Sequence, residues 1–443
     1  MLIYIVIFIE GLCSLGAEII ALRRLVPHMG SSILVTAPTI GFFLFALAVG
    51  YASGAQVQAD FARRVGRNFL LAALIAGIGL AGGTVNALFD MARPAILAYL
   101  IYMLVVLCPI AWLLGQTVPI LTNLMRHQRV GEASGMALYW STLGSFLGAT
   151  GLSLLVMQWL GVSAAVLLVA AGLVAGSLML NHRGALGWAG NLVVLALAVW
   201  INQPQPQVLA DTAYAEYRVD NIPGASNARR FRVNLSYSSQ IDDSEPPRFS
   251  QYIERIRALL LNELALSNKQ ILVLGAGGFS LSHQEPSNHY TYVDIDPSIQ
   301  AIAQTHFLKG PINGRFVAAD ARHFVDTTDQ RFDAIVVDVY SSRNSIPSHL
   351  ATREFWAGLR RPMNPGAALV ANLILDGRLN SAYARNLLAT IESVYGRCSV
   401  DVLKRGQPRS NVVVTCFEGG QPRPAVIYLD EHNRADIDRA MNP

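Results

Sequence analysis

The first half of the chain consists of long apolar runs that are separated by short polar segments. Most runs reach about 17 to 25 residues, the length that an α-helix needs to cross about 30 Å of hydrocarbon. Six runs are long and apolar enough to span, and a seventh is shorter and weaker. The candidate spans are 2–22, 33–53, 69–89, 95–115, 135–159, 162–180 and 185–201. The pattern predicts a multi-span helical membrane domain over residues 1–201.

The second half changes to shorter elements. Residues 202–207 are polar and rich in Pro, as is typical of a linker. Residues 208–241 alternate polar and apolar positions, which predicts a small β-subdomain. Over 242–443, strand-like runs such as ILVLG at 271–275 alternate with helical segments. This order predicts a parallel, doubly wound α/β sheet that can carry an antiparallel strand at its edge.

Composition separates the two halves in the same way. The chain is 52% hydrophobic and 14% charged, which is more apolar than an ordinary soluble enzyme. Residues 1–204 hold nine Arg, no Lys and five acids, whereas 205–443 hold 25 basic and 25 acidic residues. The net charge of +4 therefore comes from Arg beside the apolar runs, and no surface for nucleic acid is indicated.

The cysteine pattern indicates neither a metal site nor a disulfide framework. The four Cys are scattered and show no CxxC or Cys/His spacing. We expect them to act as small apolar fillers, and we expect no metal. They are Cys13, Cys108, Cys398 and Cys416.

Arginine placement sets the expected orientation of the helices. The loops after the second, fourth and sixth runs hold most of the Arg, which places the N-terminus in the cytoplasm by the positive-inside rule. Seven crossings would put the C-terminal domain outside the cytoplasm, and six would leave it inside. The answer depends on 185–201, which has about the minimum spanning length and contains Trp188 and Asn191.

Two carboxylates, Glu10 and Glu18, interrupt the first apolar run. An ionisable group at such a depth marks a functional position by default. Eight residues apart on a helix, the two lie on a shared flank. The alternative is that each pairs with Arg23, Arg24 or a buried amide inside the bundle.

In doubly wound sheets, ligands bind beyond the carboxyl ends of the strands. At the first such end, Gly275, Gly277 and Gly278 allow a tight turn close to a ligand. The pattern is GxGGxS and lacks the third glycine of the dinucleotide fingerprint. Asp294 ends the next strand, 19 residues beyond Gly275, near the spacing at which a carboxylate binds ribose hydroxyls. Together they predict a site for an adenosine ligand.

Two further strand ends carry acids. Asp320 in AADARHF can accept from the adenine amine, and it would serve equally as a helix N-cap. Asp338 follows the apolar IVV and opens the loop DVYSSRNSIPSHL. An acid at the end of a buried strand is poorly explained by packing. We therefore assign Asp338 as the candidate catalytic residue.

The order and spacing of these motifs resemble the polyamine aminopropyltransferase (spermidine synthase) family, in its membrane-fused form. In the second half the resemblance runs through DTAYAEYRV, LSYSSQ, RFSQYIE, ILVLGAGG, YVDID, AADA and FDAIVVDVYSSRNSIPSHLATREFW. In the first half it includes GLCSLGAEIIALRRL, GQTVPIL and LYWSTLGSFLGATG. The resemblance implies a Rossmann-like, methyltransferase-type catalytic domain over 242–443.

The resemblance also implies roles for single residues. Asp294 matches the acid that holds the ribose, and Asp320 the acid that reads adenine. Gln240 matches the Gln of the family's LDGxxQ turn, beside the nucleoside ligand's side-chain end. Asp338 matches the first acid of DSSD, which orients and deprotonates the attacking amine. The candidate substrate-binding residues are Tyr252, Tyr340 and Ser341.

Two departures from the family concern the substrate. The acid that binds the amino group of decarboxylated S-adenosylmethionine is replaced by Gly278, and the second acid of DSSD is replaced by Ser341. Losing these acids removes charge-assisted hydrogen bonds of about 1.5 to 3 kcal/mol each. The departures argue against ordinary transfer to putrescine.

These observations lead to an integral enzyme of the inner or plasma membrane that alkylates an amine. The expected co-substrate is decarboxylated S-adenosylmethionine or S-adenosylmethionine, and the expected acceptor is a small amine or an amine-bearing lipid. We expect the catalytic domain in the cytoplasm, where that nucleoside is made. The sequence leaves open whether the chain forms homo-oligomers. The alternatives are a methyltransferase, a non-catalytic nucleoside-binding transporter or sensor, and, last, a nicotinamide dehydrogenase.

Overall fold

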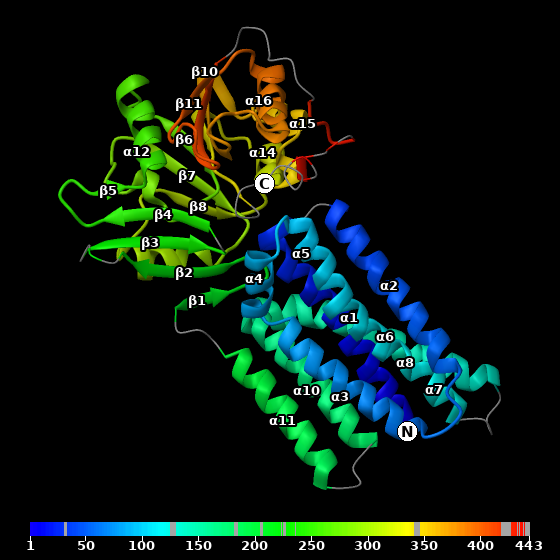
Figure 1. Ribbon diagram of the computed structural model, residues 1–443. Helices are drawn as coiled ribbons and strands as arrows, with labels where there is room; N and C mark the ends of the chain where they lie inside the picture. Colours follow the sequence, from blue (N-terminus) through cyan, green and yellow to red (C-terminus); the bar gives the residue numbers. More distant parts are fainter. Residues whose placement is uncertain are drawn as a thin grey trace. The chain divides into compact units, whose positions relative to one another are not determined.

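The chain folds into a helical unit followed by an α/β unit (Figure 1). The helical unit comprises Met1–His28, Ile33–Gln205 and Asp211–Ala213, and the α/β unit comprises Met29–Ser32, Pro206–Ala210 and Tyr214–Pro443. The structure, a computed structural model, describes all residues except 31–32, 125–129, 181–184, 204–206, 223, 225–226, 235, 341–345, 418–426, 432, 434, 437 and 439–443.

The helical unit is built from long apolar helices, two of which continue through short π-helical turns at Met103–Leu107 and Leu152–Val156. Its helices are α1 (Leu2–Met29), α2 (Ile33–Ala55), α3 (Phe61–Gly79), α4 (Gly82–Met91), α5 (Ala95–Tyr102), α6 (Cys108–Gly115), α7 (Thr117–Leu124), α8 (Val130–Gly151), α9 (Met157–Leu160), α10 (Val162–Leu180) and α11 (Ala185–Ile201).

Within the described residues, five helical segments are long and apolar enough to cross a membrane. They are Leu2–Met29, Ile33–Ala55, Ala95–Leu124, Gly131–Leu160 and Val162–Leu180. Helices α3 and α4, which cover the predicted span at 69–89, pass the same test only when they are taken together, and they meet at an angle of 65°. The break falls in the glycine-rich GIGLAGG, where helix propensity is low.

The outer surface of the helical unit is apolar. Large side chains such as Phe45, Leu104, Leu154 and Trp159 are all more than half exposed. Exposed apolar surface of this extent is typical of a surface that contacts lipid or a partner rather than water. These helices could therefore lie in a membrane.

Close backbone packing holds α1 against α8. A methyl group built on Gly144 would overlap the carbonyl oxygen of Phe8, and one built on Gly148 would overlap that of Leu12. Gly11 is likewise in contact with the backbone of α8. Small residues at such contacts let two helices approach closely, which is the main source of helix association in lipid.

The α/β unit begins with a small antiparallel sheet. The described strands follow the order β1-β2-β3-β4-β5, so each strand pairs with its neighbours in sequence. The last strand extends the predicted β-subdomain beyond residue 241. The strands are β1 (Val208–Asp211), β2 (Glu216–Asn221), β3 (Ala228–Val233), β4 (Ser236–Asp242) and β5 (Arg248–Phe249).

The main sheet has the order β11-β12-β10-β9-β6-β7-β8 among the described strands. Strands β6 to β10 run parallel, and β12 pairs antiparallel with both β10 and β11. The antiparallel strand thus lies one position in from the edge instead of at the edge. The strands are β6 (Gln270–Leu274), β7 (His289–Asp294), β8 (Arg315–Ala318), β9 (Phe332–Val337), β10 (Met363–Leu375), β11 (Ser399–Val402) and β12 (Ser410–Cys416).

Helices cover both faces of this sheet, which confirms the doubly wound, Rossmann-like arrangement. One apolar core joins the sheet to α14, α15 and α16, and a second joins its other face to α12 and α13 (Figure 1). These helices are α12 (Gln251–Ala258), α13 (Ile299–Ile302), α14 (Ala321–Thr327), α15 (Arg353–Gly358) and α16 (Ala382–Tyr395).

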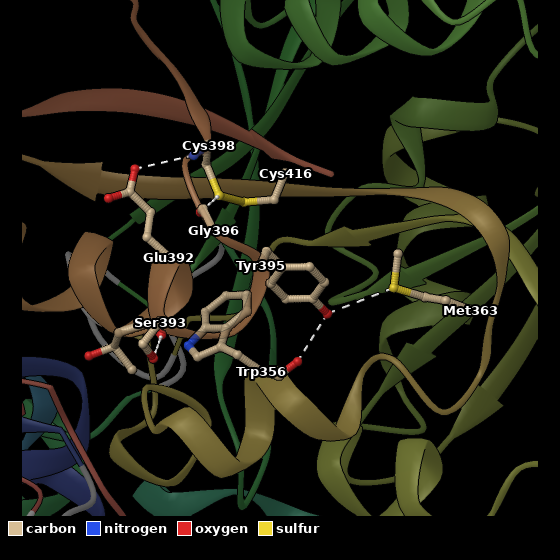
Figure 2. Close-up of a disulfide and its surroundings, with 9 residues drawn as sticks. Trp356, Met363, Glu392, Ser393, Tyr395, Gly396, Cys398 and Cys416 are labelled. Carbon is tan, nitrogen blue, oxygen red and sulfur yellow. Dashed lines mark hydrogen bonds between the residues drawn. A yellow bond between two sulfur atoms is a disulfide. The ribbon is translucent and has the colours of Figure 1, made fainter. Parts of the chain in front are cut away.

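The expectation that all four Cys are fillers is wrong for two of them. Cys398 and Cys416 form a disulfide, although they are 18 residues apart in sequence (Figure 2). Ser399 pairs with Thr415 across β11 and β12, so the two Cys stand opposite each other at the end of this hairpin. Spacing along the chain did not reveal the pair, because it depends on the register of the hairpin.

A matched pair of substitutions in α8 tests the helix contact. Gly144→Ala should destabilise the helical unit by about 1 to 3 kcal/mol, because the methyl group has no room against α1. Gly135→Ala in the same helix should be neutral or stabilising, since nothing lies within 4 Å of its Cβ position and Ala favours helix. Thermal unfolding in detergent measures both, and equal melting temperatures would contradict the packing.

Candidate active site

A narrow pocket opens where β6, β7 and β9 end. These strands are neighbours in the main sheet, so the loops that follow them meet at one place. The residues lining the pocket come from these strands and the loops that follow them, from β4 and from α12. Those used here are Ser239, Tyr252, Gly275, Gly277, Tyr292 and Asp338.

The glycine loop after β6 forms one wall of the pocket. Gly275 and Gly277 adopt φ values of +91° and +49°, which side chains disfavour. A methyl group on Gly275 would overlap the carbonyl oxygen of Asp338. The glycines therefore bring the loop directly against the end of β9.

Gly278 has no room for the acid that the family resemblance places there. Its Cβ position would overlap the ring of Phe307 and would lie 2.9 Å from Cβ of Ser239. Its backbone N–H donates to Oγ of Ser239 at 3.1 Å. The space that a carboxylate at position 278 would need is thus already occupied by Phe307 and Ser239.

Asp294 lies at the end of β7 and braces the glycine loop. One carboxylate oxygen accepts from the N–H of Ala276 at 3.0 Å, and the other accepts from the N–H of Asp296 at 3.1 Å. Burial raises the pKa of Asp294 above its usual value, and these hydrogen bonds oppose the rise. Each oxygen keeps a further lone pair that a ribose hydroxyl could use.

Asp320 adopts the N-cap geometry that the sequence offered as its alternative role. Its Oδ1 accepts from the N–H of His323 at 2.9 Å at the start of α14, and its Oδ2 lies 3.4 Å from Nε2 of His349. The side chain is 38% exposed. Capping leaves lone pairs available, so the adenine role stays a prediction.

Asp338 is held by the buried Asn372, which is itself held by the half-buried Asn411. Nδ2 of Asn372 donates to Oδ1 of Asp338 at 2.8 Å, and Nδ2 of Asn411 donates to Oδ1 of Asn372 at 3.0 Å. Burial raises the pKa of Asp338 to about 6, although the hydrogen bonds from Asn372 and Tyr252 lower it. A carboxylate with that pKa can accept a proton near neutral pH.

Two tyrosines lie near Asp338, and of these Tyr252 lines the pocket. The hydroxyl of Tyr252, in α12, donates to the carbonyl oxygen of Ser238 and lies beside Asp338. Burial, and after it the charge of Asp338, raises the pKa of Tyr252. The hydroxyl of Tyr340 donates to the carbonyl oxygen of Asn372 at 2.5 Å. Burial and the charge of Asp338 also raise the pKa of Tyr340, so both hydroxyls stay neutral near the candidate base.

Several predicted residues do not line the described pocket, namely Gly278, Asp320, Tyr340 and Gln240. Gln240 accepts from Nε of Arg230 at 3.3 Å and is absent from the described pocket lining, where its neighbour Ser239 is found. Ser341 lies outside the described residues. The structure places Asp338, Tyr252 and the first two glycines in one lining, with Asp294 directly behind the loop.

The predicted membrane carboxylates lie inside the helical unit. Glu10 is 2% exposed and accepts from Oγ of Ser141 at 2.9 Å, and Glu18 is 4% exposed. The arginines proposed as their partners contact a different acid, because Arg23 and Arg24 lie 3.9 and 3.5 Å from the carboxylate of Asp211.

Sequence reasoning missed Asn372 and Ser239. Asn372 is 2% exposed in the otherwise apolar strand sequence ALVANLIL, so a polar residue among buried neighbours was the available signal. Ser239 alternates with Gln240 on β4, and only the register of the sheet shows which of the two faces the pocket. Among the described residues, no group of His, Cys, Asp or Glu could hold a metal ion.

The known proteins to which the chain is similar in sequence are polyamine aminopropyltransferases. No family model matches it. It is 32% identical over 136 residues to a polyamine aminopropyltransferase of Vibrio vulnificus, and this match covers 29% of the chain and only 44% of that protein. It is 23% identical over 407 residues to polyamine aminopropyltransferase 1 of Streptomyces coelicolor, covering 82% of the chain and 74% of that protein.

A second relative of similar extent is a polyamine aminopropyltransferase of Corynebacterium efficiens, with 25% identity over 384 residues, 77% of the chain and 71% of that protein. A solved probable spermidine synthase from Corynebacterium glutamicum superposes with a TM-score of 0.39 at 20% identity, covering 46% of the chain and 77% of that protein. The chain is therefore homologous at low identity, over much of its length, to polyamine aminopropyltransferases.

Restoring the missing acid tests the filled space at Gly278. Gly278→Asp should lower the melting temperature and should not tighten binding of decarboxylated S-adenosylmethionine, because the side chain overlaps Phe307. Gly310→Asp is the control, since nothing lies within 4 Å of its Cβ position. Unfolding and calorimetric titration measure the two effects. Wild-type stability with tighter binding in Gly278→Asp would show that the space is available.

Proposed function

We propose that the chain is an integral membrane enzyme that alkylates an amine, with decarboxylated S-adenosylmethionine as co-substrate and methylthioadenosine as product. The observation that carries the proposal is the position of Asp338, a base beside the glycine loop and Asp294. The low-identity homology to polyamine aminopropyltransferases supports it. The apolar outer surface of the helical unit supports the membrane location.

In this proposal the α/β unit mainly positions two reactants. Asp294 binds the ribose hydroxyls and Asp320 the adenine amine, so that the sulfonium end reaches the pocket beside Asp338. Asp338 takes a proton from the acceptor's ammonium group, and the freed nitrogen lone pair attacks the methylene carbon next to the sulfonium. The carbon–sulfur bond breaks with its electrons moving to sulfur, which leaves neutral methylthioadenosine. Because the sulfonium is a good leaving group, positioning and one base are sufficient.

Gly278 favours methyl transfer from S-adenosylmethionine as the second candidate. With no acid at this position and no room for one, the amino group of an aminopropyl chain lacks the anchor that the family resemblance implies. Methyl transfer does not need this anchor, and its product would be S-adenosylhomocysteine. Mass spectrometry of products formed from each nucleoside, with a lipid extract and mixed amines as acceptors, distinguishes the two reactions.

Substitution of the base tests catalysis directly. Asp338→Asn should reduce turnover by about 10² to 10⁴-fold, the usual contribution of a general base, while nucleoside affinity stays near the wild-type value. Product formation and calorimetric titration measure the two quantities. Tyr214→Phe, an exposed tyrosine outside the pocket, serves as a control and should keep full turnover. An unchanged rate in Asp338→Asn would remove Asp338 from the mechanism.

The pH dependence tests the environment of the same carboxylate. Activity needs ionised Asp338, so kcat/KM should fall as the pH drops through about 6. Asn372→Leu removes a hydrogen bond that favours the ionised form of Asp338. The pH at which kcat/KM falls should therefore rise by about one unit. Asn411→Ala, one step further from the acid, should shift it less in the same direction. If kcat/KM of Asn372→Leu falls at the same pH as in the wild type, the assignment of Asp338 as the titrating base is contradicted.

A further inference from the structure

Contacts between helices fix the direction of each helix in the helical unit. Gly16 of α1 contacts Leu152 just after α8, and Gly11 contacts Ser141 of α8, so α1 and α8 run in the same direction. Gly172 of α10 contacts Cys13 of α1, and Gly16 contacts Val169 of α10, so α10 runs the opposite way. The start of α1 and the end of α10 therefore lie at the same end of the bundle.

Helix α11 runs beside α3 along most of its length, which matters because 185–201 is the span left open by the sequence. Near its start, the Cβ position of Gly190 lies 3.8 Å from Leu70, and near its end Ala198 lies 2.8 Å from the Cβ position of Gly77. Just after α11, Nδ2 of Asn202 donates to the carbonyl oxygen of Gly77 at 2.7 Å. The helix therefore runs parallel to α3 and, at 17 residues, rises about 25 Å.

The chain leaves the bundle at the end where α1 and α3 finish. There Nη2 of Arg23 donates to the carbonyl oxygen of Thr212 at 3.0 Å, and Arg24 contacts Asp211. Arg24 also donates to the carbonyl oxygen of Leu80 at 3.1 Å and to Oγ of Ser163, at the start of α10, at 3.2 Å. We call this the exit end of the bundle, because α11 finishes there and residues 211–213 belong to the helical unit.

The opposite end of the bundle comprises the starts of α3, α8 and α11 and the ends of α7 and α10. In the sequence, six of the nine Arg before residue 204 fall in or next to these helix ends: Arg63, Arg64, Arg67, Arg126, Arg129 and Arg183. We call it the Arg-rich end. The exit end has Arg23, Arg24 and Arg93, and the first two contact the carboxylate of Asp211. The positive-inside rule therefore puts the Arg-rich end in the cytoplasm and the exit end outside it.

The cysteines give an independent indication of the same side. Cys398 and Cys416 of the α/β unit are paired and buried, whereas Cys13 and Cys108 of the helical unit are free. Structural disulfides persist in oxidising compartments and are rare in the cytosol, where thiols are kept reduced. The charge pattern uses only the helical unit and the disulfide only the α/β unit, so neither observation depends on the other.

We propose that α11 crosses the membrane and that the α/β unit lies on the extracytoplasmic side, in an oxidising compartment where Cys398 and Cys416 stay joined. This inference rests on the membrane location in the proposed function, and it reverses the cytoplasmic side expected from where the nucleoside is made. The nucleoside and the amine must then reach the pocket from outside the cytoplasm. A step that exports or releases an adenosine sulfonium on that side must supply the reaction.

Cysteine labelling of the full chain tests the side directly. Gln330→Cys places a thiol on an exposed loop of the α/β unit, and Gln58→Cys places one on the connection before α3 at the Arg-rich end. In intact spheroplasts, a membrane-impermeant maleimide should label Gln330→Cys as fully as after permeabilisation. Gln58→Cys should be labelled only after permeabilisation. The wild-type chain gives the background from its own Cys.

The reverse pattern, with Gln58→Cys labelled and Gln330→Cys protected, would overturn the proposal. The disulfide provides a second readout: after acid quenching and full denaturation, which exposes these buried residues, Cys398 and Cys416 should react with a maleimide only after reduction. Free thiols at both positions would count against an oxidising compartment. Recovery of the chain in the soluble fraction would overturn both this inference and the membrane part of the proposed function. Absence of product with correct labelling would refute only the proposed reaction.

Discussion

The contact between the glycine loop and the end of β9 is the constraint on which the candidate site depends. Gly275 packs against the carbonyl of Asp338 so closely that no side chain fits between them. Backbone hydrogen bonds continue the ladder beyond the strands, from Asp338 N–H to Leu274 and from Gly275 N–H to Val293. These hydrogen bonds fix the ends of β6, β7 and β9 relative to one another. The loop that would hold a nucleoside and the acid that would act on its partner cannot move independently.

A second property of the site is that its acid is enclosed but not neutralised by a cation. Its described partners are the amide of Asn372 and the hydroxyl of Tyr252, which stabilise the ionised form only in part. Desolvation therefore dominates and keeps the affinity for a proton high. An arginine in place of Asn372 would give a more stable carboxylate and a weaker base. The two asparagines fix the orientation of the carboxylate without removing its basicity.

Much of the fold could be predicted from the sequence because its signals are local. Alternating strands and helices predicted the doubly wound sheet, and long apolar runs predicted the helices. The features that were missed depend on contacts between distant segments. The bend between α3 and α4 and the disulfide needed the tertiary arrangement or the register of β11 and β12. In the site, strand-end acids were visible in sequence, whereas Asn372 and Ser239 required knowledge of which strands are neighbours and which way their side chains face.

The position of β12 in the sheet determines when the sheet can be completed during synthesis on the ribosome. It is the last described strand in sequence, yet it lies between β10 and β11, and β11 pairs with no other described strand. The edge of the sheet therefore cannot assemble until residues 410–416 have left the ribosome. Before that point β11 has no described partner strand, and the edge of β10 that later pairs with β12 stays open. For the extracytoplasmic location proposed above, this late completion has a consequence, because a chain whose sheet is unfinished can pass a translocation channel without first unfolding.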